Sequence, residues 1–175
     1  MVEIEAYESN PDPWGYYNNL DDQKRLDRLK LILDQLSFKR VIDIGCGNGF
    51  LTENIKAPEV LGVDVSHAAV GWGELRAAEL GLSTHAYCPG DILSQEIQNH
   101  GHFDLVVLTG VLYEQYVGGA YNIVRHNIDR ILVQGGHLIS CHILEWNPIR
   151  FAYTAIDQQI YQYGRYMHSI ELYRK

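Results

Sequence analysis

A glycine-rich segment is the part of the sequence whose spacing most clearly suits a chemical role. Residues 41–49 read Val-Ile-Asp-Ile-Gly-Cys-Gly-Asn-Gly, so a short apolar run leads into glycines at alternate positions. Glycines let the backbone turn sharply and let a ligand approach without meeting a Cβ atom. A dinucleotide-binding fingerprint would place its third glycine at position 50, which is Phe50. The segment therefore predicts a ligand-binding loop, and its spacing opposes a nicotinamide dinucleotide.

An acidic residue ends the next apolar run. Asp64 closes residues 60–64 and follows Gly49 by 15 positions. A carboxylate at the end of a second strand can accept two hydrogen bonds from a ribose diol. The alternative is that Asp64 caps the following helix, for which Ser66 is an equally good candidate. Because both strands and the glycine loop occur together, we predict a ribose-containing ligand.

The elements that must position these residues alternate in type along the chain. Apolar runs predict strands at residues 41–44, 60–64, 84–87, 103–108, 137–143 and 169–173. Helical spacing predicts helices at residues 21–37, from the glycine loop to about 55, and at 68–80, 120–133 and 148–163. This order predicts an α/β fold with a mostly parallel central sheet of six to seven strands and helices on both faces. We expect one domain over residues 1–175, with an arm or lid at 1–20, a leading helix at 21–37 and the core at 38–175.

The composition and charge of the chain limit the kinds of partner that it can bind. The chain has 175 residues, a formal net charge of −8 and no cluster of Lys and Arg, which opposes nucleic-acid binding. No apolar run reaches the ~20 residues that span a bilayer, and the acidic start does not resemble a signal peptide. The three separated cysteines favour a reducing cytoplasm, and His100 and His102 lack a third metal ligand nearby. We therefore expect a cytoplasmic protein without membrane or metal; the sequence does not indicate an oligomeric state.

Over about residues 40–145 these segments resemble class I S-adenosylmethionine-dependent methyltransferases. The resemblance implies a Rossmann-like fold with an antiparallel C-terminal strand. It also implies S-adenosyl-L-methionine as cofactor and S-adenosyl-L-homocysteine as product. By this likeness Gly45, Gly47 and Gly49 pass under the methionine part, Asp43 lies near its amino group and Asp64 holds the ribose.

A second set of positions extends the resemblance. Residues 89–92, Pro-Gly-Asp-Ile, match the family's acidic position after the third strand. This implies that Asp91 meets the adenine amino group and Ile92 packs against the ring; Asp91 could instead be a turn or cap residue. Residues 132–139 match the segment before the fifth strand, with Gln134 in place of the usual proline. The predicted cofactor contacts also include Cys46, Val65, Gly90 and Thr109.

A narrower likeness is to the nodulation-protein S group, small enzymes that methylate the nitrogen of an amino sugar. Asp-Pro-Trp at residues 12–14, with Arg25 eleven residues after Trp14, matches that group's N-terminal arm. Val-Leu-Tyr at 111–113 matches its segment after the fourth strand, although Gly110 replaces an acidic residue. The likeness implies that Trp14 covers the cofactor and Arg25 pairs with its carboxylate. Alternatively, Trp14 anchors the core and Arg25 is a solvated charge on the leading helix.

Three side chains are candidates for work on the methyl acceptor. Tyr113 and Glu114 follow the fourth strand and His142 ends the fifth, so each could orient or deprotonate an acceptor. Methyl transfer is a direct displacement in which a neutral amine needs no base. The sequence favours a small polar acceptor, such as an amine or amino sugar. The alternatives are O-methylation of a small hydroxyl or carboxylic acid with His142 or Glu114 as base, and a non-catalytic cofactor-binding or partner-activating domain.

The C-terminal part departs from the family pattern. Class I methyltransferases end with a helix and two strands, but only about 30 residues follow the fifth strand here. We therefore expect one helix at 148–163 and one strand at 169–173. With so few residues, the acceptor site is either open or closed by the N-terminal arm.

Overall fold

A seven-stranded sheet organises the computed structural model, which describes residues 5–147 and 149–175. The strands are β1 (Arg40–Ile44), β2 (Glu59–Asp64), β3 (His85–Pro89), β4 (Phe103–Thr109), β5 (Leu132–Ile143), β6 (Thr154–Tyr163) and β7 (Tyr166–Arg174). The helices are α1 (Leu20–Leu33), α2 (His67–Leu80), α3 (Glu114–Val117) and α4 (Tyr121–Ile131), with 3-10 turns η1 (Glu5–Glu8), η2 (Thr52–Asn54) and η3 (Gln95–His100).

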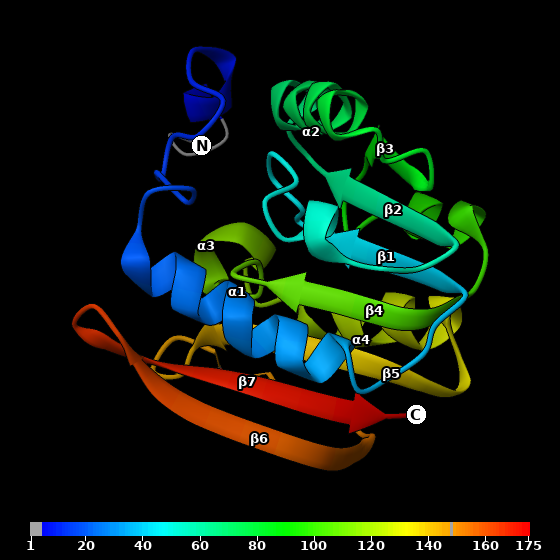
Figure 1. Ribbon diagram of the computed structural model, residues 1–175. Coiled ribbons are helices and arrows are strands. Elements are labelled where there is room, and N and C mark those ends of the chain that lie inside the picture. The colour runs from blue at the N-terminus through cyan, green and yellow to red at the C-terminus, as the bar shows by residue number, and fades with distance from the viewer. Residues whose placement is uncertain (1–4, 148) are drawn as a thin grey trace.

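The strand order is β3-β2-β1-β4-β5-β7-β6 (Figure 1). Strands β1 to β5 pair in parallel, whereas β7 runs antiparallel to both β5 and β6. Because parallel strands end at the same edge, the glycine loop after β1, Asp64 at the end of β2 and Thr109 at the end of β4 meet there. The predicted α/β fold with a mostly parallel sheet and an antiparallel C-terminal strand is confirmed.

Helices cover both faces of the sheet. In Figure 1, α1 lies in front of the central strands and α4 lies behind them. Asn19 caps α1 by accepting a hydrogen bond from the Asp21 backbone N–H. The buried side of α1, including Leu26 and Leu29, packs on the apolar residues of β1, β4, β5 and β7. This packing fixes the N-terminal end of α1, and with it Arg25, beside the carboxyl edge of the sheet.

The predicted helix at 148–163 is wrong: residue 148 lies outside the described residues, 149–153 are irregular, and 154–163 form strand β6. β6 pairs with β7 along its length, and a two-residue loop with Gly164 at φ 54° joins Tyr163 to Tyr166. Such short loops need a residue that tolerates positive φ, and Gly164 supplies it. The β-branched and aromatic residues of β6 suit this pairing. The chain therefore contains both C-terminal strands of the family pattern.

The leading helix predicted at 21–37, α1, ends at Leu33, and residues 34–37 form turn and loop. A second helix and a further boundary also differ from the prediction. The segment after the glycine loop forms only the short η2 turn rather than an α-helix. It is too short for two helical turns before Pro58, whose ring disfavours helical backbone at the preceding residue. At the other boundary, α4 ends at Ile131 and β5 begins at Leu132, before the predicted strand start at residue 137.

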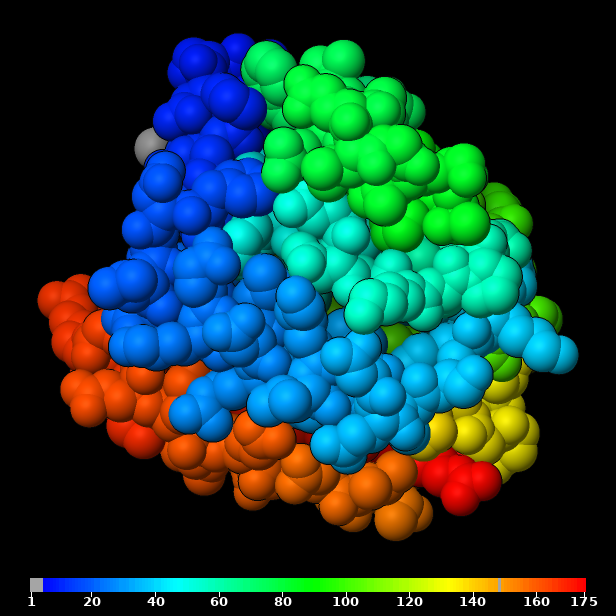
Figure 2. Space-filling model, in the orientation of Figure 1, coloured from blue at the N-terminus to red at the C-terminus, as the bar shows by residue number. Residues whose placement is uncertain are grey.

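The N-terminal arm is ordered against the glycine loop and α2. The Trp72 Nε1–H of α2 donates to the Tyr7 carbonyl at 3.0 Å, and the Asn48 side-chain amide donates to the Pro11 carbonyl at 2.7 Å. Figure 2 shows the arm, in dark blue, lying against α2 in green. The arm therefore covers the sheet edge at which the predicted ligand loop lies. No helix of the described part of the chain is long and apolar enough to cross a membrane.

Candidate functional site

The glycine loop depends on backbone that other residues rarely adopt. Gly45, Gly47 and Gly49 have φ values of 76°, 55° and 86°. A Cβ atom on Gly45 would overlap the Val111 side chain, and one on Gly47 would overlap the Tyr7 hydroxyl. The loop is therefore packed closely between the arm and the segment after β4, and only glycine fits at these positions.

Asp64 connects this loop to the end of β2. Its Oδ2 accepts from the Gly47 N–H at 2.8 Å and its Oδ1 accepts from the Ser66 N–H at 2.9 Å. Burial raises the pKa of Asp64, while these two backbone N–H groups oppose the shift. Ser66, rather than Asp64, caps α2 by accepting from the Ala69 N–H at 3.2 Å. Each carboxylate oxygen keeps a lone pair, so the group can still accept the two O–H donors of a ribose.

Asp43 lies beneath the loop. It is 1% exposed, and its Oδ2 accepts from the Thr52 hydroxyl at 2.7 Å. Burial raises the pKa of Asp43 to about 6 against the lowering effect of that hydrogen bond. Cys46 points the other way and packs with Val70 and Tyr87 between the sheet and α2. The Cys46 thiol also lies 3.5 Å from the Gly47 carbonyl oxygen.

The end of β3 completes the edge. The Gly90 N–H donates to the Asp64 carbonyl at 2.9 Å, so the two strand ends lie together. Asp91 is exposed, and its Oδ1 accepts from the Leu93 N–H at 2.8 Å. The buried Asn127 side chain donates to the Ile92 carbonyl at 2.7 Å and holds this segment in place.

Two further predicted cofactor contacts, Val65 and Thr109, lie in different surroundings. Val65, directly after β2, is 47% exposed, which suits apolar contact with a ligand. Thr109 ends β4 with a buried Oγ1 that has no hydrogen-bond partner in the described chain. Buried polar atoms are rarely left unpaired, so Thr109 marks a point where a ligand atom would complete the bonding.

Trp14 and Arg25 lie above this edge. The Trp14 ring is 39% exposed and lies 5.1 Å from the Tyr7 ring and 6.1 Å from the Tyr16 ring, centroid to centroid. Arg25 is largely buried, forms an ion pair with Asp22 in which Nη2 lies 2.8 Å from Oδ1, and packs 5.4 Å from the Tyr16 ring centre. Arg25 is thus neither a solvated helix charge nor an isolated cation.

Together these groups fit a nucleoside that carries a zwitterionic tail. Backbone without Cβ atoms suits a close approach, the Asp64 carboxylate suits a diol, and the Arg25 guanidinium suits a carboxylate. The unpaired Thr109 hydroxyl lies on the same edge. Within residues 5–147 and 149–175, no group of three or more His, Cys, Asp or Glu side chains is arranged to hold a metal ion.

A cavity of about 610 Å³ lies beside the segment that follows β4. Val111 of this segment touches Gly45, so the cavity and the glycine loop are separated by one stretch of chain. The cavity contains two of the three predicted acceptor residues and several that the sequence patterns did not single out. Its lining is Tyr113, Glu114, Gln115, Tyr121, Leu144, Glu145, Trp146 and Asn147.

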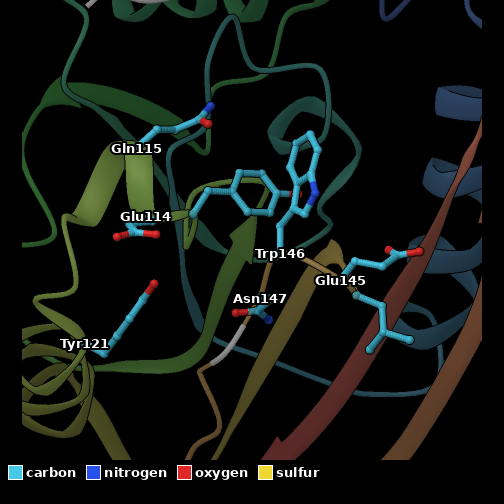
Figure 3. Close-up of a pocket in the computed structure, with 8 residues that line it drawn as sticks. Glu114, Gln115, Tyr121, Glu145, Trp146 and Asn147 are labelled. Atoms are coloured by element: carbon cyan, nitrogen blue, oxygen red, sulfur yellow. The ribbon is translucent and has the colours of Figure 1, made fainter.

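The lining is aromatic and acidic. Tyr113 packs edge-on to Trp146 with ring centroids 5.7 Å apart, and its hydroxyl accepts from the Ile143 N–H at 2.9 Å. In Figure 3 the Glu114 carboxylate and the Tyr121 hydroxyl point toward each other. Glu145 points away toward β7, where its Oε1 accepts from the Met167 N–H at 3.2 Å. No Lys, Arg or His is among the lining residues.

His142 is held as a neutral, hydrogen-bonded group. It is fully buried, and its Nε2 accepts from the backbone N–H groups of Val111 at 3.2 Å and Leu112 at 3.1 Å. The other ring nitrogen therefore carries the proton and lies 3.1 Å from the Ser140 hydroxyl. Burial lowers the pKa of His142 to about 3, with His168 and Arg25 adding to the shift. The Nε2 lone pair thus holds the Val111–Leu112 segment, which lies between the glycine loop and the cavity.

Sequence reasoning missed Trp146, Tyr121 and Asn147 as lining residues. Trp146 and Asn147 follow β5, at the same edge as the glycine loop, so their position after a strand was an available signal. Tyr121 begins a helix, and its place in the cavity depends on how α3 and α4 pack. No local pattern could have indicated it.

Comparison with known proteins identifies the family. The profile of a family described as methyltransferase domain matches residues 36–171, most of the chain. The chain belongs to this methyltransferase family. The predicted methyltransferase class is thus confirmed, and solved methyltransferases of this fold hold S-adenosyl-L-methionine or S-adenosyl-L-homocysteine, the predicted cofactor and product.

Two curated relatives show how far the likeness extends. The methyltransferase is 32% identical over 152 residues to a ubiquinone biosynthesis O-methyltransferase from Alkalilimnicola ehrlichii, over 85% of this chain and 60% of the relative. It is 28% identical over 149 residues to nodulation protein S from Sinorhizobium fredii, over 82% of this chain and 66% of the relative. The chain thus spans about three-fifths of the length of the ubiquinone-biosynthesis relatives.

Solved structures share the fold. An N-methyltransferase NodS from Bradyrhizobium japonicum in complex with S-adenosyl-L-homocysteine superposes with a TM-score of 0.82 and 23% identity, covering 99% of this chain and 97% of that one. A magnesium protoporphyrin IX methyltransferase from Synechocystis with bound S-adenosylmethionine gives 0.71 and 19% identity, covering 89% and 81%. These likenesses confirm the Rossmann-like methyltransferase architecture.

Proposed function

We propose that this methyltransferase methylates the nitrogen of a small polar amine, such as an amino sugar. The observation that carries the proposal is the cavity of about 610 Å³ beside the glycine loop, with its aromatic and acidic lining and no cationic lining residue. Aromatic faces attract cationic groups, and a carboxylate pairs with an ammonium. An anionic acceptor would meet repulsion from Glu114 and find no basic partner in the cavity wall.

The proposal also assigns the residues that contact the cofactor. When bound, S-adenosylmethionine would supply a sulfonium methyl group, whose carbon the acceptor attacks as the thioether sulfur leaves. The glycine loop holds the methionine part, Asp64 accepts the ribose hydroxyls, and Asp91 and Ile92 hold the adenine. Trp14 covers the site, and Arg25 binds the carboxylate through the donors that Asp22 leaves available.

On the acceptor side, the side chains orient an amine and exclude water. Tyr113 and Trp146 form an apolar wall, and Glu114 provides the carboxylate nearest the acceptor nitrogen. The reacting amine must be neutral, because only its lone pair can form the new bond to carbon. Glu114 stabilises the positive charge that develops on nitrogen as that bond forms, and its exposed position lets the released proton reach solvent.

His142 acts in this proposal as a positioning residue. Its Nε2 holds the Val111 and Leu112 N–H groups, so it fixes the segment between cofactor and acceptor. Proton abstraction by His142 would require breaking both of those bonds. Amine methylation needs no such base.

O-methylation of a hydroxyl or carboxylic acid is the second candidate. It is favoured by the 32% identity to a ubiquinone biosynthesis O-methyltransferase. A hydroxyl acceptor would need a base, and with the His142 lone pair engaged, Glu114 would have to serve. The cavity lining supports the amine better, because a neutral amine needs no base and the Glu114 carboxylate stabilises the positive charge that develops on its nitrogen.

The test is methyl transfer by the wild-type protein and by Glu114→Gln, with Glu74→Gln on the exposed side of α2 as control. A panel of small amines, amino sugars, neutral sugars and carboxylic acids serves as acceptors. We expect turnover of amines, and a fall in kcat/KM of about tenfold in Glu114→Gln because the carboxylate that stabilises the developing charge is lost. The control should match the wild type. Turnover confined to hydroxyl or acid acceptors would contradict the proposal.

A further inference from the structure

His168 on β7 is a buried ring without hydrogen bonds. Its side chain is 4% exposed, and neither Nδ1 nor Nε2 has a partner among the described residues. Polar groups in protein interiors are almost always paired with protein, water or ligand. Two unpaired nitrogens on one buried ring therefore point to a group that binds there.

The register places His168 at the ligand edge of the sheet. It pairs with Ile143, the last residue of β5, whose carboxyl end lies at the same edge as the glycine loop. Alternate residues of a strand share a face. Ile170 and Leu172, two and four residues further on, belong to the apolar cluster under α1. The His168 ring consequently lies on the α1 face, the face from which Arg25 approaches the sheet.

Arg25 and His168 share a neighbour. The Tyr163 ring stacks on His168 with centroids 4.3 Å apart and planes 16° from parallel, and the Arg25 guanidinium carbon lies 5.9 Å from the same ring centre. Burial lowers the pKa of His168 to about 4, and the nearby Arg25 charge contributes to that shift. The ring is therefore neutral at pH 7, with one N–H to donate and one lone pair.

The chemistry of this pair suits a carboxylate. A guanidinium donates in fixed directions that match two carboxylate oxygens, and a neutral imidazole adds one further N–H donor. Only Nη2 of Arg25 is paired with a carboxylate among the described residues, that of Asp22. Thr109, two strands away on β4, lies on the same face with its hydroxyl unpaired. The polar groups thus continue from Thr109 at the cofactor edge towards His168.

We propose that His168 donates a hydrogen bond to the carboxylate at the amino-acid end of S-adenosylmethionine, beside Arg25. The inference rests on the proposed pairing of Arg25 with that carboxylate and adds a second donor from β7. Tyr16, a residue of the arm, lies over Arg25 and closes this end of the site from outside. The C-terminal hairpin thereby becomes part of the cofactor site rather than only its support.

The experiment compares two ligands by calorimetry, S-adenosyl-L-homocysteine and its decarboxylated form. His168→Phe keeps a ring that can stack on Tyr163 but removes both nitrogens. His168→Gln restores a donor, and His126→Gln, on the exposed side of α4, is the control for losing a histidine. Thermal unfolding of each protein is measured in parallel.

We expect His168→Phe to bind S-adenosyl-L-homocysteine about ten- to a hundredfold more weakly, as for loss of a hydrogen bond to a charged group. Its affinity for the decarboxylated form should equal that of the wild type. His168→Gln should recover part of the loss, and His168→Phe should unfold at the same or a higher temperature because an unpaired buried polar ring is gone. A purely structural role would lower stability and affect both ligands alike.

Unchanged affinity of His168→Phe for S-adenosyl-L-homocysteine would overturn the proposal. An equal loss for both ligands would also overturn it, since the effect would then not involve the carboxylate. Binding of the two ligands by the wild-type protein separates failure of the His168 proposal from failure of the cofactor assignment. If the wild-type protein binds neither ligand, the cofactor assignment itself is wrong.

Discussion

The state of His142 predicts how stability responds to acid. Its folded-state pKa of about 3 lies below the unfolded value of about 6.5. Such a group stabilises the folded protein above pH 6.5, and this contribution is lost as the pH falls from 6.5 towards 3. Between pH 7 and pH 5 the linkage amounts to roughly 2 kcal/mol of unfolding free energy.

The whole-protein pH curve cannot isolate this effect. The pKa of Asp43 is raised to about 6, so Asp43 favours the folded state increasingly as the pH falls from 6 to its unfolded value of about 3.8. The pKa of His168 is lowered to about 4, so His168, like His142, makes the folded protein less stable as the pH falls. A difference between two proteins that share these groups removes both contributions.

The perturbation is His142→Gln, whose amide oxygen can accept from the Val111 and Leu112 N–H groups but does not titrate. Urea unfolding of both proteins at pH 7 and pH 5 gives the stability difference at each pH. We expect the variant to be less stable at pH 7 by about 1–3 kcal/mol, since one acceptor is replaced imperfectly. The gap should narrow by roughly 2 kcal/mol at pH 5. His126→Gln serves as control, and a gap that stays constant would refute the buried neutral histidine.

Three further predictions concern the cofactor edge and the cavity. Asp64→Asn should weaken S-adenosyl-L-homocysteine binding about ten- to a hundredfold by calorimetry, because a charged acceptor is lost; unchanged affinity would contradict the ribose assignment. Chymotrypsin, for which the arm offers aromatic cleavage sites, should cleave the arm more slowly when this ligand is added, and Trp14→Ala should reduce the protection; equal cleavage in both states would contradict a lid. Tyr113→Phe removes the acceptor for the Ile143 N–H and should lower the unfolding free energy by about 1 kcal/mol in urea titrations, whereas an unaltered midpoint would show that water replaces the hydroxyl.

The cofactor edge was predictable because its signals are local. Glycines at positions 45, 47 and 49 have positive φ, as their spacing after a buried strand predicts. Asp64 ends β2 beside them, and its bond to Gly47 follows from parallel strands ending at one edge. Here backbone geometry and sequence pattern carry the same information.

The C-terminal hairpin and the acceptor cavity were less accessible. β6 is stabilised by pairing with β7, a tertiary contact that overrode the helical interpretation, although the glycine between Tyr163 and Tyr166 was a usable turn signal. The engagement of His142 depends on the loop after β4 folding back on β5, some 30 residues later in the chain. A sequence places a histidine at a strand end but does not show which groups its nitrogens meet.

We propose that the acceptor atom of the transferred methyl group is nitrogen. The most direct measurement uses S-adenosylmethionine labelled with ¹³C in its methyl group, with glucosamine and N-acetylglucosamine as paired acceptors, and carbon–proton NMR of the products. The two sugars carry similar hydroxyls and differ in whether the nitrogen has a free lone pair. We expect a labelled N-methyl signal from glucosamine and none from N-acetylglucosamine. A labelled O-methyl signal from both sugars would contradict it.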